Sequence, residues 1–142
     1  MSKPVATTVE THVELGNLPL LVSLPRTPIG VQWKLADVAS GSAATLLALL
    51  RFSPEDYRAI ARESGELEGP APATLPADLY DGWLPEEAKA GLTVKREGEL
   101  CNLPDALTRQ PTLFTQLERS PYKNGRVVML SNGYVLVSLY AM

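Results

Sequence analysis

Cysteine and histidine are nearly absent from this sequence of 142 residues, which contains one of each, Cys101 and His12. A single cysteine cannot form an intramolecular disulfide, and this fits the reducing cytoplasm, where we expect the protein to reside. The same shortage excludes a zinc site built only from cysteine and histidine within one chain. A nucleophilic cysteine would have to be Cys101 with His12 as its base, and nothing in the sequence brings the two together. We therefore predict no catalytic residue, no metal site and no cofactor, although a carboxylate-rich site for a hard cation stays open.

Long apolar runs are absent as well. The longest are Ala43–Leu50, Val127–Leu130 and Val135–Leu139, all far below the ~20 residues that cross a bilayer. Residues 1–4 lead into no apolar stretch of the kind that a secretion signal contains, so we expect neither secretion nor a membrane partner. The net charge of −3 and the scattered basic residues argue against a nucleic-acid partner, because phosphate contacts need a basic stripe.

The sequence does contain enough apolar residues for one folded domain. A length of 142 residues fits a single domain over 1–142, and a hydrophobic content of 45% can fill its core. Alternating apolar residues predict strands over Val5–Leu15 and Val31–Leu35, and Leu20–Leu24 is expected to be a further strand or an edge segment. Because strand patterns concentrate at the two ends, we predict an α+β fold, with a mostly antiparallel sheet and helices packed on one face.

Helix signals occupy the middle of the chain. Ser42 is a candidate cap for a helix over 43–51, whose leucines would make it apolar around most of its circumference. The run Ser53-Pro54-Glu55-Asp56 is a strong start signal for a second helix that ends near Glu63. The remaining expected elements are short helices over Pro85–Ala90, Asn102–Arg109 and Pro111–Arg119, and a strand over Leu92–Arg96.

A C-terminal β-hairpin has the clearest local signal. The β-rich runs Arg126–Ser131 and Tyr134–Tyr140 are joined by Asn132-Gly133, which suits a type I′ turn. A two-residue turn at this place pairs Leu130 with Val135, Val128 with Val137, and Arg126 with Leu139. Both faces of the hairpin are then apolar, so both must be covered. The cover could come from a sandwich or barrel, from helices, or from a second copy of the chain in a homodimer through the hairpin.

Charge is distributed unevenly. Residues 55–99 hold eleven acidic and five basic residues, a net charge of −6, whereas the rest of the chain carries +3. Within this part, 66–82 contains three prolines and is predicted to be a proline-rich acidic surface loop. Aromatic residues alternate with acids at its end and beyond it, a pattern that suits aromatic anchors inside an acidic rim. The predicted partner-binding residues are Asp78, Tyr80, Asp81, Trp83, Glu86 and Glu87.

These residues favour a non-catalytic protein-binding module that engages a basic protein partner, such as an adaptor, a secretion-type chaperone or a toxin-neutralising inhibitor. A structural alternative is that Tyr80 and Trp83 hold the loop on its own core while the acids keep it soluble. Two other functions stay open. One is a small-ligand-binding protein or enzyme, with a pocket between sheet and helices that uses the loop carboxylates. The other is a structural subunit of a larger assembly.

Overall fold

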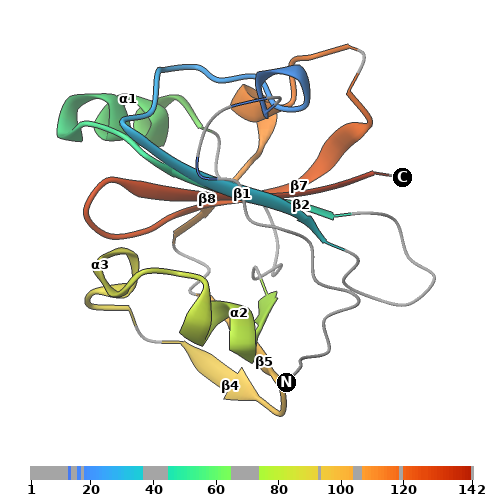
Figure 1. Ribbon diagram of the computed structural model, residues 1–142. Coiled ribbons are helices and arrows are strands. Elements are labelled where there is room, and N and C mark those ends of the chain that lie inside the picture. The colour runs from blue at the N-terminus through green and yellow to red at the C-terminus, as the bar shows by residue number, and fades with distance from the viewer. Residues whose placement is uncertain are drawn as a thin grey trace.

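The structure, a computed structural model, describes residues 13, 16, 18–36, 45–64, 74–92, 94–103, 107–118 and 120–141. These residues form an antiparallel sheet of five strands in the order β1-β2-β8-β7-β6 and a smaller antiparallel sheet in the order β3-β5-β4 (Figure 1). The large sheet contains β1 Gly30–Ala36, β2 Thr45–Arg51, β6 Thr108–Arg109, β7 Tyr122–Met129 and β8 Tyr134–Ala141. The small sheet contains β3 Thr74–Pro76, β4 Lys95–Glu97 and β5 Leu100–Asn102. The helices are α1 Pro54–Glu63, α2 Ala77–Gly82 and α3 Glu86–Lys89, with 3-10 turns η2 Leu18–Leu20 and η4 Thr112–Phe114. This is the predicted α+β fold, and it includes the C-terminal hairpin β7–β8.

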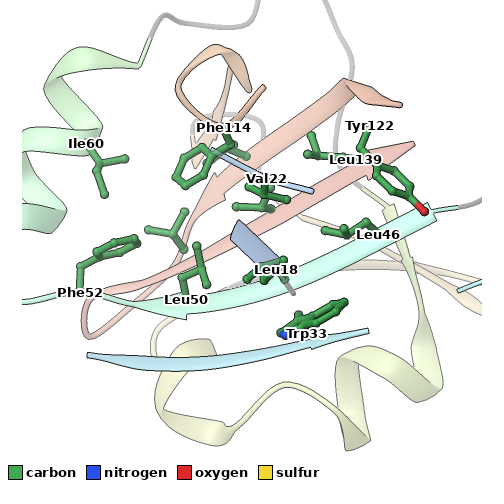
Figure 2. Packing of buried hydrophobic residues seen from close by; sticks show 14 of the residues in the cluster. Leu18, Val22, Trp33, Leu46, Leu50, Phe52, Ile60, Phe114, Tyr122 and Leu139 are labelled. Carbon is green, nitrogen blue, oxygen red and sulfur yellow. The ribbon is translucent and has the colours of Figure 1, made fainter. Parts of the chain in front are cut away.

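The large sheet is buried on both faces. One face packs under α1, η2 and η4, where Leu46, Leu50 and Leu139 of the sheet meet Ile60 of α1 and Phe114 of η4 (Figure 2). The other face packs on a second layer made of α2, α3 and the small sheet, which lies on the opposite side of the large sheet from α1 (Figure 1). Both apolar faces of the hairpin are therefore covered by other parts of the same chain.

Residues 45–51 form strand β2, so the predicted helix over 43–51 is wrong. The strand lies between β1 and β8, and Leu46 through Leu50 are at most 2% exposed. Their side chains alternate between the two cores, Leu46 toward α1 and Leu47 toward the second layer. A continuous apolar run occurs both in buried helices and in strands that are buried on both faces. The periodicity of the sequence therefore could not distinguish a helix from a strand here. Ser42, the predicted cap, lies outside the described residues.

The hairpin has the predicted turn but a different register. Asn132 and Gly133 both have positive φ angles, +57° and +84°, as a type I′ turn requires. However, the Ser131 N–H donates to the carbonyl of Ala88 in α3 (3.1 Å) instead of crossing the hairpin, and the Leu130 N–H donates to Tyr134 O. Two residues of one strand thus oppose one of the other, as in a β-bulge.

From Asn124 to Met129, the bulge moves each pair of the hairpin by one residue relative to the prediction. The observed pairs are Met129 with Val135, Val128 with Leu136 and Val127 with Val137. Val127 and Val137 consequently share the face under α1, whereas Val128 and Leu136 share the face toward the second layer. The predicted pairing was wrong because it assumed that the turn closed a hairpin without a bulge, and a shift of one residue changes which side chains share a face.

Several other predicted elements are confirmed. Strand β1 turns Val31, Trp33 and Leu35 toward the core under α1, as their alternation predicted. Helix α1 begins after Ser53, whose hydroxyl accepts a hydrogen bond from the Asp56 N–H. The sequence also placed α3 and β4 correctly to within a few residues.

Three short elements differ from the predictions. Leu20–Leu24 is not a strand: η2 ends at Leu20, and turns and bends follow it. Within 102–109, Asn102 ends β5 and Thr108–Arg109 form β6, so no helix runs from Asn102 through Arg109 as predicted. Leu107 has 3-10 conformation, and 104–106 lie outside the described residues. The helix predicted from Pro111 is limited to the three residues of η4. The strand predicted over Val5–Leu15 falls almost wholly outside the described residues.

None of the helices in the described part of the chain has the length and apolar character needed to cross a bilayer.

Candidate functional site

The six predicted partner-binding residues lie on α2, on α3 and on the turn between them. Only 74–82 of the segment predicted as a proline-rich loop is described, and it forms β3 and α2 instead of an irregular loop. Pro76 ends the short strand, where the next residue, Ala77, donates its N–H to Glu99 O (2.7 Å) and opens the helix. A proline is compatible with these positions because it stands at an element boundary and interrupts no regular hydrogen bond.

Tyr80 is a core residue of the second layer. It is 6% exposed, and its ring lies between two cations, with Lys89 Nζ at 5.1 Å and the Arg96 guanidinium at 5.8 Å from the ring centroid. Burial raises the pKa of the phenol, and nearby acidic groups add to this effect. The ring therefore fastens α2 to its own core, as the structural alternative describes, and offers little surface to a partner.

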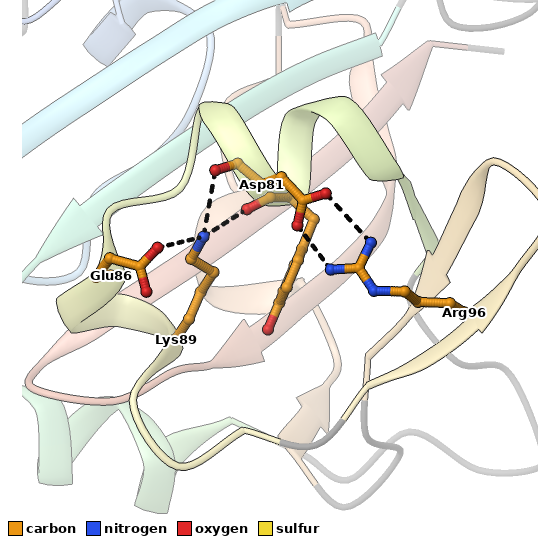
Figure 3. Close-up of polar contacts among 5 residues, drawn as sticks. Asp81, Glu86, Lys89 and Arg96 are labelled. Atoms are coloured by element: carbon orange, nitrogen blue, oxygen red, sulfur yellow. Dashed lines mark hydrogen bonds and ion pairs between the residues drawn. The ribbon is translucent and has the colours of Figure 1, made fainter.

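Asp81 forms a bidentate ion pair with Arg96 of β4 (Figure 3). The Arg96 Nη2 lies 2.7 Å from Oδ1 and Nη1 lies 3.2 Å from Oδ2. The hydrogen bonds from Arg96 lower the pKa of Asp81, and the same contact raises the pKa of Arg96. Both side chains are about half exposed, at 54% and 50%. The pair links α2 to the small sheet through a contact that a partner could still reach.

Lys89 holds the end of α2 from the following helix (Figure 3). Its Nζ donates to the carbonyl oxygens of Tyr80 (2.9 Å) and Asp81 (3.4 Å) and pairs with Glu86 Oε2 at 3.3 Å. An ammonium group at the carbonyl end of a helix satisfies acceptors that have no partner within the helix. The Lys89 side chain is only 9% exposed, whereas that of Glu86 is 92% exposed. Glu86 therefore presents its carboxylate to solvent even while it is paired.

Trp83 is half-buried against β1. Its carbonyl accepts a hydrogen bond from Gln32 Nε2 (2.7 Å), and Lys34 Nζ lies 5.6 Å from its ring centroid. Partial burial lowers the pKa of Lys34, and the charge of Asp78 acts against that effect. Gln32 and Lys34 are site residues that sequence reasoning missed. The sequence indicates them only as the polar residues that alternate with the apolar ones in the predicted strand over Val31–Leu35.

Glu87 connects α3 to the hairpin turn. Its backbone carbonyl accepts from Asn132 Nδ2 (2.7 Å), and its Oε1 lies 3.5 Å from Tyr134 Oη. The side chains of Asp78, Asp81, Glu86 and Glu87 are all exposed, so the segment presents four carboxylates on one stretch of chain. Three bases, Lys34, Lys89 and Arg96, lie among them. The surface is therefore acidic, but less so than the sequence of the segment alone indicates.

The other chemical candidates form no site among the described residues. Cys101 is fully buried in the second layer, and His12, its predicted partner, lies outside the described residues. Within the described ranges, no three or more His, Cys, Asp or Glu side chains gather where they could hold a metal ion. The chemistry that this surface offers is hydrogen bonding, charge and one partly exposed indole, which also packs against the core of the second layer.

Comparison of the chain with protein-family models, with curated proteins and with solved structures gave no match in any of the three cases.

Proposed function

We propose that this chain is a non-catalytic protein-binding module that engages a basic partner through the surface of α2, α3 and the turn between them. The observation that carries the proposal is the placement of four exposed carboxylates on one continuous segment around a partly exposed indole, that of Trp83. An adaptor, a secretion-type chaperone and a toxin-neutralising inhibitor would all use such a surface in the same way, and the cytoplasm is the proposed compartment.

The roles of the residues differ in this proposal. Trp83 supplies apolar area that a partner can bury, which is where interface energy concentrates. Glu86 and Glu87 supply the accessible negative charge that speeds encounter with a basic surface and sets its orientation. Tyr80 acts indirectly, because its buried ring holds α2 in place.

The alternative functions have less support. A pocket enzyme that uses the segment's carboxylates would need one of them with a raised pKa in a cleft, but the pKa of Asp81 is lowered by its ion pair with Arg96. A homodimer through the hairpin is one of the covers that its two apolar faces allow, and both faces are packed within this chain. A role as a subunit of a larger assembly stays a prediction, and a mass measurement in solution would test it.

The experiment is affinity capture from the native cell at low and moderate salt, followed by kinetics with the purified basic protein that it retains. Trp83→Ala should weaken binding by roughly 30-fold, mainly through faster dissociation, which is the size of effect seen for a central aromatic anchor. The double variant Glu86→Gln with Glu87→Gln should slow association and reduce its salt dependence.

A matched control separates a docking surface from general charge. Glu99 and Glu118 are also exposed glutamates, but they lie outside the segment. Glu99→Gln with Glu118→Gln changes the net charge by the same amount and should leave the association rate nearly unchanged. Equal losses in the two double variants would mean that only net charge matters and would overturn the proposal, as would capture of no basic protein.

A further inference from the structure

A pocket of about 480 Å³ opens beside the hairpin turn, and none of its lining residues belongs to α2 or α3. It lies between the end of β2, the start of α1 and the turn between β7 and β8. Its volume falls within the range of cavities that hold small organic ligands. The lining residues are Ile29, Arg51, Phe52, Pro54, Tyr57, Arg58, Asn132 and Gly133.

Hydrogen bonds hold the walls of this pocket in place. The Ile29 N–H donates to Arg51 O (2.7 Å), and the Phe52 N–H donates to Gly133 O (2.9 Å). The hydroxyl of Tyr57 donates to Leu130 O at 2.6 Å and so ties α1 to the hairpin. The pocket is thus built from three elements that the fold fixes relative to one another, and a ligand would find it formed.

The chemistry of the walls is divided between apolar area and positive charge. Ile29, Pro54 and the ring of Tyr57 supply the apolar part, and Ile29 remains 66% exposed at the rim. The Phe52 side chain is only 1% exposed and packs in the core under α1, so it supports this wall from behind. Burial raises the pKa of the Tyr57 phenol, so this wall stays neutral at physiological pH. A ligand that fits these walls needs an apolar body.

The two charged residues of the lining are both arginines. Arg51 lies with its guanidinium 5.3 Å from the ring centroid of Tyr134, and its Nε donates to Asn132 O at 3.4 Å. Among the described residues, no carboxylate lies within ion-pair distance of Arg51 or of Arg58. Both guanidinium groups therefore keep hydrogen-bond donors for an anion, and their planar donor pairs match the two oxygens of a carboxylate.

We propose that this pocket binds a small organic acid, with its carboxylate held by Arg51 and Arg58 and its apolar body between Ile29, Pro54 and Tyr57. This goes beyond the protein-binding function, because the site uses other residues and the opposite charge. Neither proposal depends on the other, so each can fail alone.

The test is a titration of the ¹⁵N-labelled full-length chain with phenylacetate, followed by amide chemical shifts. The expected result is a saturable shift centred on Phe52, Arg58 and Gly133. Arg58→Gln should weaken the binding roughly tenfold or more, the size expected when a charge-assisted hydrogen bond is lost. Arg62→Gln is the matched control, because Arg62 is an exposed arginine on the same helix but does not line the pocket. It should leave binding unchanged.

Further probes separate the charge from the apolar body. Ile29→Glu places a negative charge at the rim on an exposed side chain and should abolish binding, whereas Ile29→Gln should reduce it only slightly. Phenylacetamide should bind much more weakly than phenylacetate, and inorganic phosphate more weakly than phenylphosphate.

Several results would overturn the proposal. They are no saturable shift up to about 10 mM, which corresponds to negligible affinity; shifts away from the pocket; equal binding of the neutral amide; and equal losses in the Arg58 and Arg62 variants. Phenylphosphate binding much more tightly than phenylacetate would also overturn the assignment to a carboxylate.

Discussion

Replacing Gly133 with alanine should destabilise the protein by about 2–3 kcal/mol. Gly133 has φ +84°, where a side chain costs about 1–2 kcal/mol. An added Cβ would also lie 2.5 Å from the carbonyl oxygen of Phe52, so the turn would have to move away from that residue. The hydrogen bond from Phe52 N–H to Gly133 O would be weakened by the movement, at a cost of about 1 kcal/mol.

Gly98 provides the control for this substitution. It also has a positive φ, +64°, but a Cβ there would meet nothing within 4 Å. Gly98→Ala should therefore show the backbone cost alone, about 1–2 kcal/mol. Urea unfolding of both variants gives the comparison, provided that the slope with urea concentration is unchanged. Equal losses of stability in the two alanine variants would show that the close approach of Gly133 to Phe52 has no energetic effect, contrary to this prediction.

Two further predictions concern the second layer and its ion pair. Leu136→Ala should lower the free energy of unfolding by about 2–5 kcal/mol, because the Leu136 side chain is fully buried between the layers. Leu100→Ala, at a site 46% exposed, should lower it by less than about 1 kcal/mol. Urea unfolding measures both losses, and similar values would contradict the layered core. An NMR titration of the Asp81 carboxyl should give a pKa below the usual aspartate range, and Arg96→Gln should raise it. Because the pKa of Asp81 is lower in the folded than in the unfolded state, the ion pair stabilises the fold at neutral pH, and this stabilisation is lost as the pH falls through the folded-state pKa. Arg96→Gln should therefore make folding less sensitive to acid. An unchanged Asp81 titration in this variant would contradict the prediction.

Elements whose signals are local could be predicted from the sequence. The cap at Ser53 and the proline after it placed α1, and alternation placed β1 and the face that each of its residues occupies. Strand β2 could not be predicted, because its entirely apolar run has no polar side to reveal a period of two or of 3.6 residues. Only its neighbours on both sides, β1 and β8, make it a strand.

The hairpin register depended on a contact that no local pattern contains. Asn132-Gly133 gave the turn correctly, but Ser131 donates its N–H to Ala88, and its hydroxyl contacts the carbonyl of Ala90. Ala88 lies in α3 and Ala90 directly follows it, and both are far from Ser131 in the sequence. The bulge therefore results from packing between the hairpin and the second layer, and a rule for isolated hairpins cannot predict it.

The candidate site shows the same division between local and distant information. Its acidic and aromatic residues are adjacent in the sequence and could be found by inspection, but two of the bases that accompany them come from β1 and β4. Because these two bases are separated from the segment in the sequence, inspection of the segment alone could not show that they partly neutralise its charge or that Lys34 lies over the indole of Trp83.

The internal bases change what a basic partner would meet. Charges within a few ångströms of one another are hardly screened by salt, because the screening length is about 8 Å under physiological conditions. A partner therefore senses Asp81 together with Arg96 as a nearly neutral pair, and a cation that binds Asp81 must compete with a bidentate contact. Among the described residues, Glu86 has a single ion-pair contact, with Lys89, and its side chain is almost fully exposed, so its charge remains available. Affinity for a basic protein should consequently depend more on Glu86 and on the apolar area of Trp83 than on Asp81, although sequence position alone makes the three residues equivalent.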